Sequence, residues 1–280
     1  MSQILLAFLA FLITLFPIYL WGYGVSYLLD TPWNRRRFLL GMSIGAISVA
    51  IVWIFSYVGT HSVYTISAIS LFVLILAISL YILIRSGSVY ARILLGQLAT
   101  VNICIISLLL ITVVSISSII PGGVVLALSI APLLISSVIE ESSKHLMSIG
   151  LMSQDFAFSR RDIIIFTLFV VLGFVFSENL LYFFISDTGL STWIFRSLFS
   201  LTAHLLASAI CVYGWWRALS YEPYSLRYIS IFTIGFIIAI LIHLGYNMIL
   251  REGSMIGLFV YMIVGYVVVT RLLLQEKSIV

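Results

Sequence analysis

Residues 139–145 read Ile-Glu-Glu-Ser-Ser-Lys-His and place two carboxylates, an ammonium group and an imidazole inside a long apolar run. A charged side chain in the hydrocarbon layer costs about 3 kcal/mol even on lenient insertion scales, so such groups neutralise one another, line a water-filled cavity or perform chemistry. If the run is helical, Glu140 and Lys144 share one face, and Glu141 and His145 share the neighbouring face. The stretch therefore predicts a membrane helix that carries either a structural ion pair or a reactive cluster.

The composition is that of an integral membrane protein. Hydrophobic residues make up 62% of the 280 residues and charged residues only 9%, whereas soluble domains are about one quarter charged. The mean hydropathy is +1.23. The net charge of +4 is spread over short polar segments, so no basic patch for nucleic acid is expected. Cys104 and Cys211 both lie in apolar runs, which predicts buried thiols and no disulfide framework.

The apolar runs predict an all-α, polytopic membrane helix bundle. About 20 apolar residues are needed for one helix to cross the bilayer, and polar loops or Gly/Pro breaks separate nine such runs. The expected transmembrane helices are 4–29, 38–58, 63–84, 93–120, 124–151, 163–185, 192–216, 228–250 and 255–270.

The basic residues predict the orientation of this bundle. Those in polar segments lie after the first, third, fifth and seventh expected helices and in the C-terminal tail, whereas the opposite side has only Arg251. Because the basic side faces the cytoplasm, we expect a multi-pass cell-membrane protein with its N-terminus outside and its C-terminus inside, which requires an odd number of helices. The residues on the basic side are Arg35, Arg36, Arg37, Arg85, Arg92, Arg160, Arg161, Arg217, Arg227, Arg271 and Lys277.

Four successive expected helices, 124–151 to 228–250, carry polar side chains at membrane depth. Taken singly, a buried histidine is as often an interhelical hydrogen-bonding group as a metal ligand. Arg196 could extend toward the membrane–water interface. Three carboxylates, two histidines and a lysine together are poorly explained by packing, so we expect them to meet in one cavity. The residues at this depth are Glu140, Glu141, Lys144, Glu178, Asn179, Arg196, His204, Ser208, His243 and Asn247.

Glutamates and histidines in a cavity allow a limited set of functions. A glutamate can activate water as a general base, and two histidines with a carboxylate can hold zinc and leave a position open for that water. The same residues could instead form the proton relay of a transporter. The chain has no HExxH motif, and the GxSxG match at 41–45 lacks a histidine in an obvious partner position, so we interpret it as accidental. The sequence leaves open the alternative that the thiol of Cys211 is a nucleophile.

Four motifs, in order over residues 132–247, resemble those of the PrsW family of intramembrane proteases. Glu140-Glu141-Ser-Ser-Lys144 is similar to the EExxK motif of that family, and residues 173–179, Gly-Phe-Val-Phe-Ser-Glu-Asn, are similar to its GFxxxEN segment. Residues 204–208 resemble its HxxxS/T motif and residues 243–247 its HxxxN/D motif. The related CAAX-prenyl endopeptidase and bacteriocin-processing membrane proteases carry EExxxR and FxxxH, from which Lys144 and Glu178 depart.

The resemblance implies an intramembrane metalloprotease that cleaves a membrane-anchored protein or peptide within or beside the lipid bilayer. It implies a four-helix region at 1–120 without recognised motifs and a catalytic helix bundle at 121–280, in one membrane unit. A mechanism without metal, a proton-coupled transporter and an inactive relative that binds membrane peptides stay open. The implied roles are Glu140 or Glu141 as the base, Lys144 as the group that keeps this pair ionised, Glu178, His204 and His243 as Zn²⁺ ligands, Asn247 as oxyanion donor or support for the ligands, and Asn179 as a further member of the catalytic set.

Overall fold

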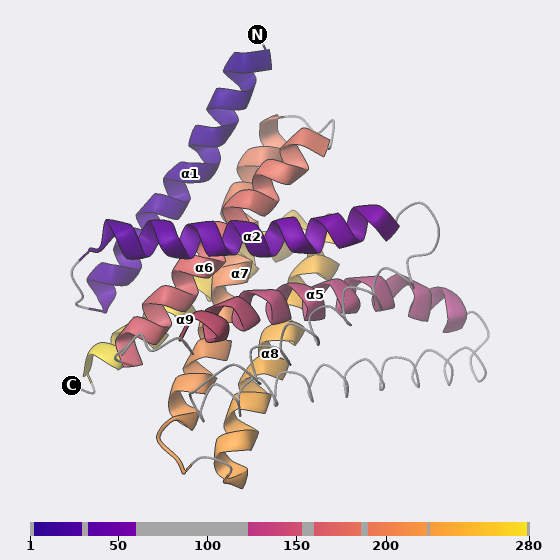
Figure 1. The fold of residues 1–280 in the computed structure, drawn as a ribbon. Helices are drawn as coiled ribbons and strands as arrows, with labels where there is room; N and C mark the ends of the chain where they lie inside the picture. Colours follow the sequence, from indigo (N-terminus) through magenta and orange to yellow (C-terminus); the bar gives the residue numbers. More distant parts are fainter. Residues whose placement is uncertain are drawn as a thin grey trace.

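The computed structural model describes residues 3–29, 33–59, 123–152, 160–185, 190–222 and 225–278, and this part of the chain is entirely helical (Figure 1). The expected helices 63–84 and 93–120 lie outside the described residues. The described helices are α1 (Gln3–Leu28), α2 (Arg35–Gly59), α5 (Gly123–Met152), α6 (Arg160–Ile185), α7 (Leu190–Ala218), α8 (Leu226–Arg251) and α9 (Met255–Ser278). The prediction of an all-α fold is therefore confirmed for this part of the chain.

The observed helix ends differ from the apolar runs where charged residues extend a helix. Five of the described helices, α1 and α6 to α9, are long and apolar enough to cross a membrane. The predicted end of the last helix at residue 270 is wrong, because α9 continues past Arg271 through three leucines and ends at Ser278. Similarly, α2 begins at Arg35, and the side chain of Asn34 accepts a hydrogen bond from the backbone N–H of Arg37 at 3.0 Å. The apolar-run pattern misses the first turn of α2 because it consists of Arg35, Arg36 and Arg37, and it misses the end of α9 because Arg271 interrupts the run before three leucines.

Helices α6 and α7 form the centre of the bundle and are buried along most of their length. Helix α1 packs on α6, α7 and α9, while α8 packs on α7 and α5. Helices α2 and α5 contact each other and both lie across the view in Figure 1, with opposite chain directions. Because α5 contacts α6, α7 and α8, its polar stretch faces the three other helices that carry candidate residues.

Helices α2 and α6 approach each other closely at glycines. A Cβ atom added to Gly41 would lie 2.5 Å from Cβ of Phe169, and one added to Gly45 or Gly173 would collide with the backbone of the opposite helix. Small residues four apart allow such close contact between membrane helices. The GxSxG match at 41–45 is thus a helix-packing surface, and its partner on α6 lies five residues before Glu178.

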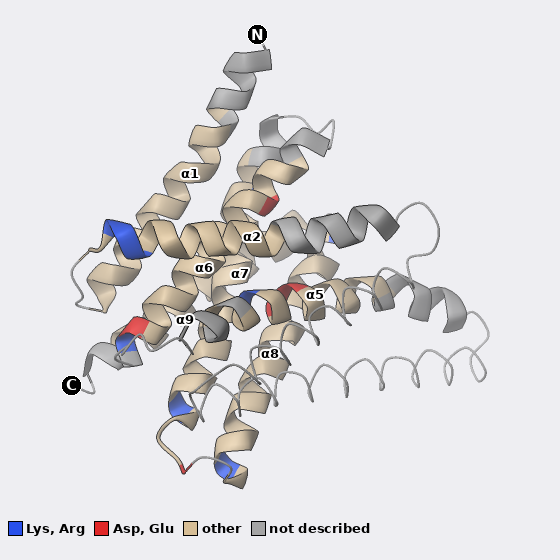
Figure 2. Cartoon of the chain, viewed as in Figure 1, with Lys and Arg blue, Asp and Glu red and all other residues tan. Residues whose placement is uncertain are grey.

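Apart from the charged residues within α5, the charged residues of the described helices lie mostly toward helix ends (Figure 2). Nη1 of Arg37 lies 2.5 Å from Oδ1 of Asp162, so the beginnings of α2 and α6 lie side by side. Arg217 lies in the last turn of α7, and Arg227 lies at the beginning of α8, which follows in the chain.

Candidate active site

The polar side chains of α5, α6, α7 and α8 meet in the interior of the bundle. The ring centroids of His204 and His243 lie 4.7 Å apart with the rings nearly perpendicular. Nδ1 of His243 lies 2.7 Å from Oε1 of Glu141, and Nδ1 of His204 lies 2.9 Å from Nζ of Lys144. Residues up to 102 positions apart in the sequence therefore form one cluster.

Lys144 pairs with Glu141, not with Glu140 as the spacing of four suggested. Nζ of Lys144 lies 2.5 Å from Oε1 of Glu141, and both side chains are fully buried. Residues three apart on a helix are neighbours as much as residues four apart, and the rotation of α5 turns Glu141 inward. Oγ of Ser136 instead donates to Oε1 of Glu140 at 2.6 Å.

Glu141 is the most heavily coordinated carboxylate of the cluster. Besides Lys144 and His243, it accepts a hydrogen bond from Oγ of Ser208 at 3.3 Å, and Nε2 of His145 lies 3.6 Å from its Oε2. Both of its oxygens are thus occupied by groups of this chain. The expected proximity of Glu141 and His145 is present, although the distance is too long for a good hydrogen bond.

Glu140 and Glu178 differ from Glu141 in their contacts. In each of them, one carboxylate oxygen accepts a hydrogen bond and the other faces an imidazole ring. Oε1 of Glu178 accepts from Nη2 of Arg196 at 3.2 Å, and its Oε2 lies 2.9 Å from Nε2 of His204. Oε2 of Glu140 lies 3.3 Å from Nε2 of His243. Despite these distances, both Oε2 atoms are buried and accept no hydrogen bond of proper direction. Two carboxylate oxygens therefore face two imidazole nitrogens at 2.9 and 3.3 Å.

This donor set fits a divalent metal ion. Glu140, His204 and His243 each offer one ligand atom, and these atoms lie within 4.8 Å of one another. Zinc prefers imidazole nitrogen and carboxylate oxygen, and a ligating histidine usually has its other ring nitrogen bound to a carboxylate. Glu141 contacts Nδ1 of His243 in this way. The two Oε2 atoms without hydrogen bonds are further acceptors that a cation would satisfy.

The two candidate asparagines, Asn247 and Asn179, differ in their hydrogen bonds. Nδ2 of Asn247 donates to Oγ of Ser137 at 3.2 Å, which joins α8 to α5 one turn before Glu141. Asn179 is buried, and its amide forms no hydrogen bond with the described residues. The structure thus places Asn247 beside the cluster and gives Asn179 no described polar contact with it.

Sequence reasoning missed two residues and left a third undecided. Ser136 lies four residues before Glu140, and Tyr182 lies four residues after Glu178. Arg196, which the sequence also allowed at the membrane–water interface, points into the cluster. Its Cζ lies 3.6 Å from the centroid of the Tyr182 ring. The helical spacing of four was the available signal for Ser136 and Tyr182.

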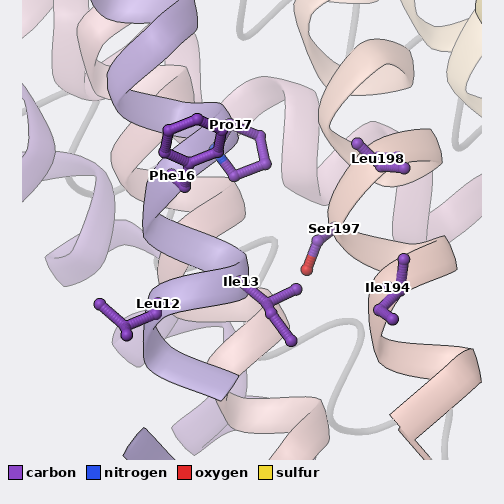
Figure 3. A pocket seen from close by; sticks show the side chains of 7 residues that line it. All are labelled: Leu12, Ile13, Phe16, Pro17, Ile194, Ser197 and Leu198. Carbon is purple, nitrogen blue, oxygen red and sulfur yellow. The ribbon is translucent and has the colours of Figure 1, made fainter. Parts of the chain in front are cut away.

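The cluster is more accessible on one side. The side chains of Glu140, Glu178 and Arg196 are 13%, 15% and 17% exposed, whereas those of Glu141 and Lys144 are not exposed at all. A separate groove of about 530 Å³ lies between α1 and α7 and is lined almost entirely by apolar side chains (Figure 3). Its lining contains none of the cluster residues, so the polar cluster and the apolar groove are distinct features.

Comparison with known proteins identifies the family. No curated protein and no solved structure matches the chain. Residues 86–273 match the family model described as PrsW family intramembrane metalloprotease. The matched range begins within the predicted 1–120 region and includes every candidate residue of the cluster. Because the match covers more than half of the chain, this protein belongs to the PrsW family of intramembrane metalloproteases and is a membrane protease.

Proposed function

We propose that the protein is an endopeptidase that hydrolyses a peptide bond of a membrane-anchored protein or peptide with a glutamate-activated water. The observation that carries this proposal is the convergence of two unbonded glutamate oxygens on the Nε2 atoms of His204 and His243. Such a site holds acceptors for a cation and for the protons of a water molecule in one place.

The two histidines and Glu178 are the proposed ligands of a Zn²⁺ ion. When bound, the ion supplies Lewis acidity to the water and to the scissile carbonyl. Glu178 suits the ligand role because Arg196 holds its other oxygen, as partners of ligating carboxylates commonly do. Glu141 contacts Nδ1 of His243 and thereby orients that ring, while Nζ of Lys144, which donates to Glu141, lies 2.9 Å from Nδ1 of His204.

Glu140 is the proposed base. Of the three carboxylates, Glu141 is occupied by Lys144, and Glu178 is paired with Arg196. Glu140 has only a neutral hydroxyl donor on one oxygen and an unbonded second oxygen beside His243. A carboxylate without a lysine or arginine partner accepts a proton more readily than one whose charge is neutralised.

Asn247 is proposed to stabilise the oxyanion of the attacked carbonyl. Its amide lies on α8 four residues after His243, and its bond to Ser137 holds it toward α5. A preorganised amide donor beside the reacting carbonyl stabilises the negative charge that develops there. Asn179 is kept as a member of the catalytic set because its buried amide has unused donors next to Glu178.

The proposed topology has nine transmembrane helices, the N-terminus outside and the C-terminus in the cytoplasm of a multi-pass cell-membrane protein. The Arg37–Asp162 pair, Arg217 at the end of α7 and Arg227 at the beginning of α8 support a charged side. We further propose that the helices of residues 1–120 support a catalytic unit at 121–280. The relation to the CAAX-prenyl endopeptidases and bacteriocin-processing proteases stays a prediction.

The test is cleavage of single-span membrane proteins that carry a tag at each end and are co-expressed with the protease. Glu140→Gln and His243→Ala are expected to abolish the fragments while membrane insertion, followed by fractionation, is unchanged. Glu252→Gln, which alters an exposed acid in a turn, is the matched control and is expected to cleave normally. Full activity in a triple Glu140→Ala, Glu178→Ala, His243→Ala variant would rule out the proposed function.

The metal content of purified variants separates the two carboxylate roles. Glu178→Gln is expected to bind the metal more weakly and to retain less of it, whereas Glu140→Gln is expected to keep it and lose only cleavage. Since Glu140 lies within ligand distance of both histidines, the reverse result would exchange the roles of the two glutamates.

A further inference from the structure

Arg196 takes no direct part in the proposed reaction, yet it is tied to the cluster by two contacts. Nη2 donates to Oε1 of Glu178 at 3.2 Å, and Cζ lies 3.6 Å from the centroid of the Tyr182 ring. Glu178 and Tyr182 lie one turn apart on α6, so both partners of the guanidinium are on the same face of that helix. Arg196 therefore connects α7 to a defined face of α6.

An arginine that merely extended toward the membrane surface would present its charge to water. The side chain of Arg196 is only 17% exposed, and its guanidinium is directed at a glutamate of the cluster. Stacking on a ring and donating to a carboxylate at the same time requires the planar guanidinium, which lysine lacks. These contacts indicate that Arg196 binds Glu178 and Tyr182 specifically and does not extend to the membrane surface.

The position of Arg196 determines which oxygen of Glu178 is free. Because the guanidinium binds Oε1, Oε2 is left 2.9 Å from Nε2 of His204. Without the guanidinium, only the contact between Oε2 and Nε2 of His204 would hold the carboxylate, which could then turn about its last side-chain bond.

We propose that Arg196 is a positioning residue, whose guanidinium, stacked on Tyr182, holds Glu178 with one oxygen directed at His204 and the metal position. This inference rests on the proposed function, in which Glu178 is a metal ligand. Removal of a group that orients a metal ligand commonly lowers metal affinity or activity by about 10–100-fold. Arg196→Gln is therefore expected to weaken metal binding and lower kcat to that extent, with little change in KM.

The experiment uses the full chain, purified in detergent and stripped of metal, with Co²⁺ as the probe. The visible absorption of bound Co²⁺ gives the affinity without any need for activity. The kcat and KM are measured on a tagged single-span protein that the wild type cleaves. Arg196→Lys is expected to recover only part of the loss, because it restores the charge without the planar geometry. Arg251→Gln, at the end of α8, is the matched control and is expected to match the wild type.

A double variant distinguishes positioning from an independent contribution. If Arg196 acts through Glu178, then Arg196→Gln combined with Glu178→Gln is expected to bind Co²⁺ no more weakly than Glu178→Gln alone. Fully additive losses would overturn the inference. The inference would also be overturned if Arg196→Gln kept the kcat and the Co²⁺ affinity of the wild type, whether or not its KM were raised.

Two further results complete the test. If Arg196→Gln does not fold, Tyr182→Leu removes only the stacking ring and is expected to lower kcat and Co²⁺ affinity in the same direction; unchanged values would overturn the inference. If Glu178→Gln itself keeps normal cleavage and Co²⁺ affinity, the proposed function is wrong at this ligand and the inference falls with it. Loss in Glu178→Gln without loss in Arg196→Gln refutes the role of Arg196 alone.

Discussion

Lys144→Met removes the cation that neutralises a fully buried carboxylate while it keeps most of the apolar length of the side chain. Nζ of Lys144 lies 2.5 Å from Oε1 of Glu141, and neither side chain is exposed. Removal of one partner of a buried ion pair costs about 3–5 kcal/mol, because the remaining charge has no compensation. Ser208 and His243 still contact Glu141 and offset part of this cost. We expect Lys144→Met to lower the free energy of unfolding by about 3 kcal/mol, at the low end of that range.

The double variant Lys144→Met with Glu141→Gln provides the decisive comparison. Since it removes both charges, it is expected to be more stable than Lys144→Met alone, with a coupling energy of about 2 kcal/mol between the two sites. Arg271→Met, which removes an exposed cation on α9, is the control and is expected to change stability by less than about 0.5 kcal/mol.

The assay is equilibrium unfolding of the purified variants in mixed detergent micelles, with SDS as the denaturant and helical circular dichroism as the signal. A single cooperative transition in each variant allows the free energies to be compared. If Lys144→Met unfolds within about 0.5 kcal/mol of the wild type, Glu141 does not depend on Lys144, and the account of the buried pair is refuted.

Three further predictions concern packing, the base and the metal. Gly45→Ala is expected to destabilise the protein by about 1–3 kcal/mol through overpacking against α6, whereas Gly24→Ala, which has open space for a Cβ, should not; equal SDS midpoints would contradict the close contact. Ser136→Ala removes the donor to Glu140 and is expected to lower kcat about tenfold, while the exposed Ser43→Ala is expected to leave kcat unchanged. Treatment with 1,10-phenanthroline is expected to stop cleavage and added Zn²⁺ to restore it, and undiminished cleavage by demonstrably metal-free protein would argue against the metal.

Local composition predicted the helices because a membrane helix must satisfy its own backbone and present apolar side chains over about 20 residues. The predicted run 163–185 ends where α6 ends, and the run 228–250 lies within α8. The sequence also identified the polar residues of the site, because a charged side chain within an apolar membrane run is costly and marks a functional site. The family match at residues 86–273 agrees with the motifs that these residues form.

Tertiary structure alone decided which of these side chains contact one another. A spacing of three or four defines a helix face, but the rotation and crossing of the helices determine what that face meets. For this reason the sequence could not show that Lys144 pairs with Glu141, that Arg196 turns inward to Glu178, or that 41–45 packs on α6. Sequence thus predicted the described helices and their polar residues, whereas packing between helices decided the partners.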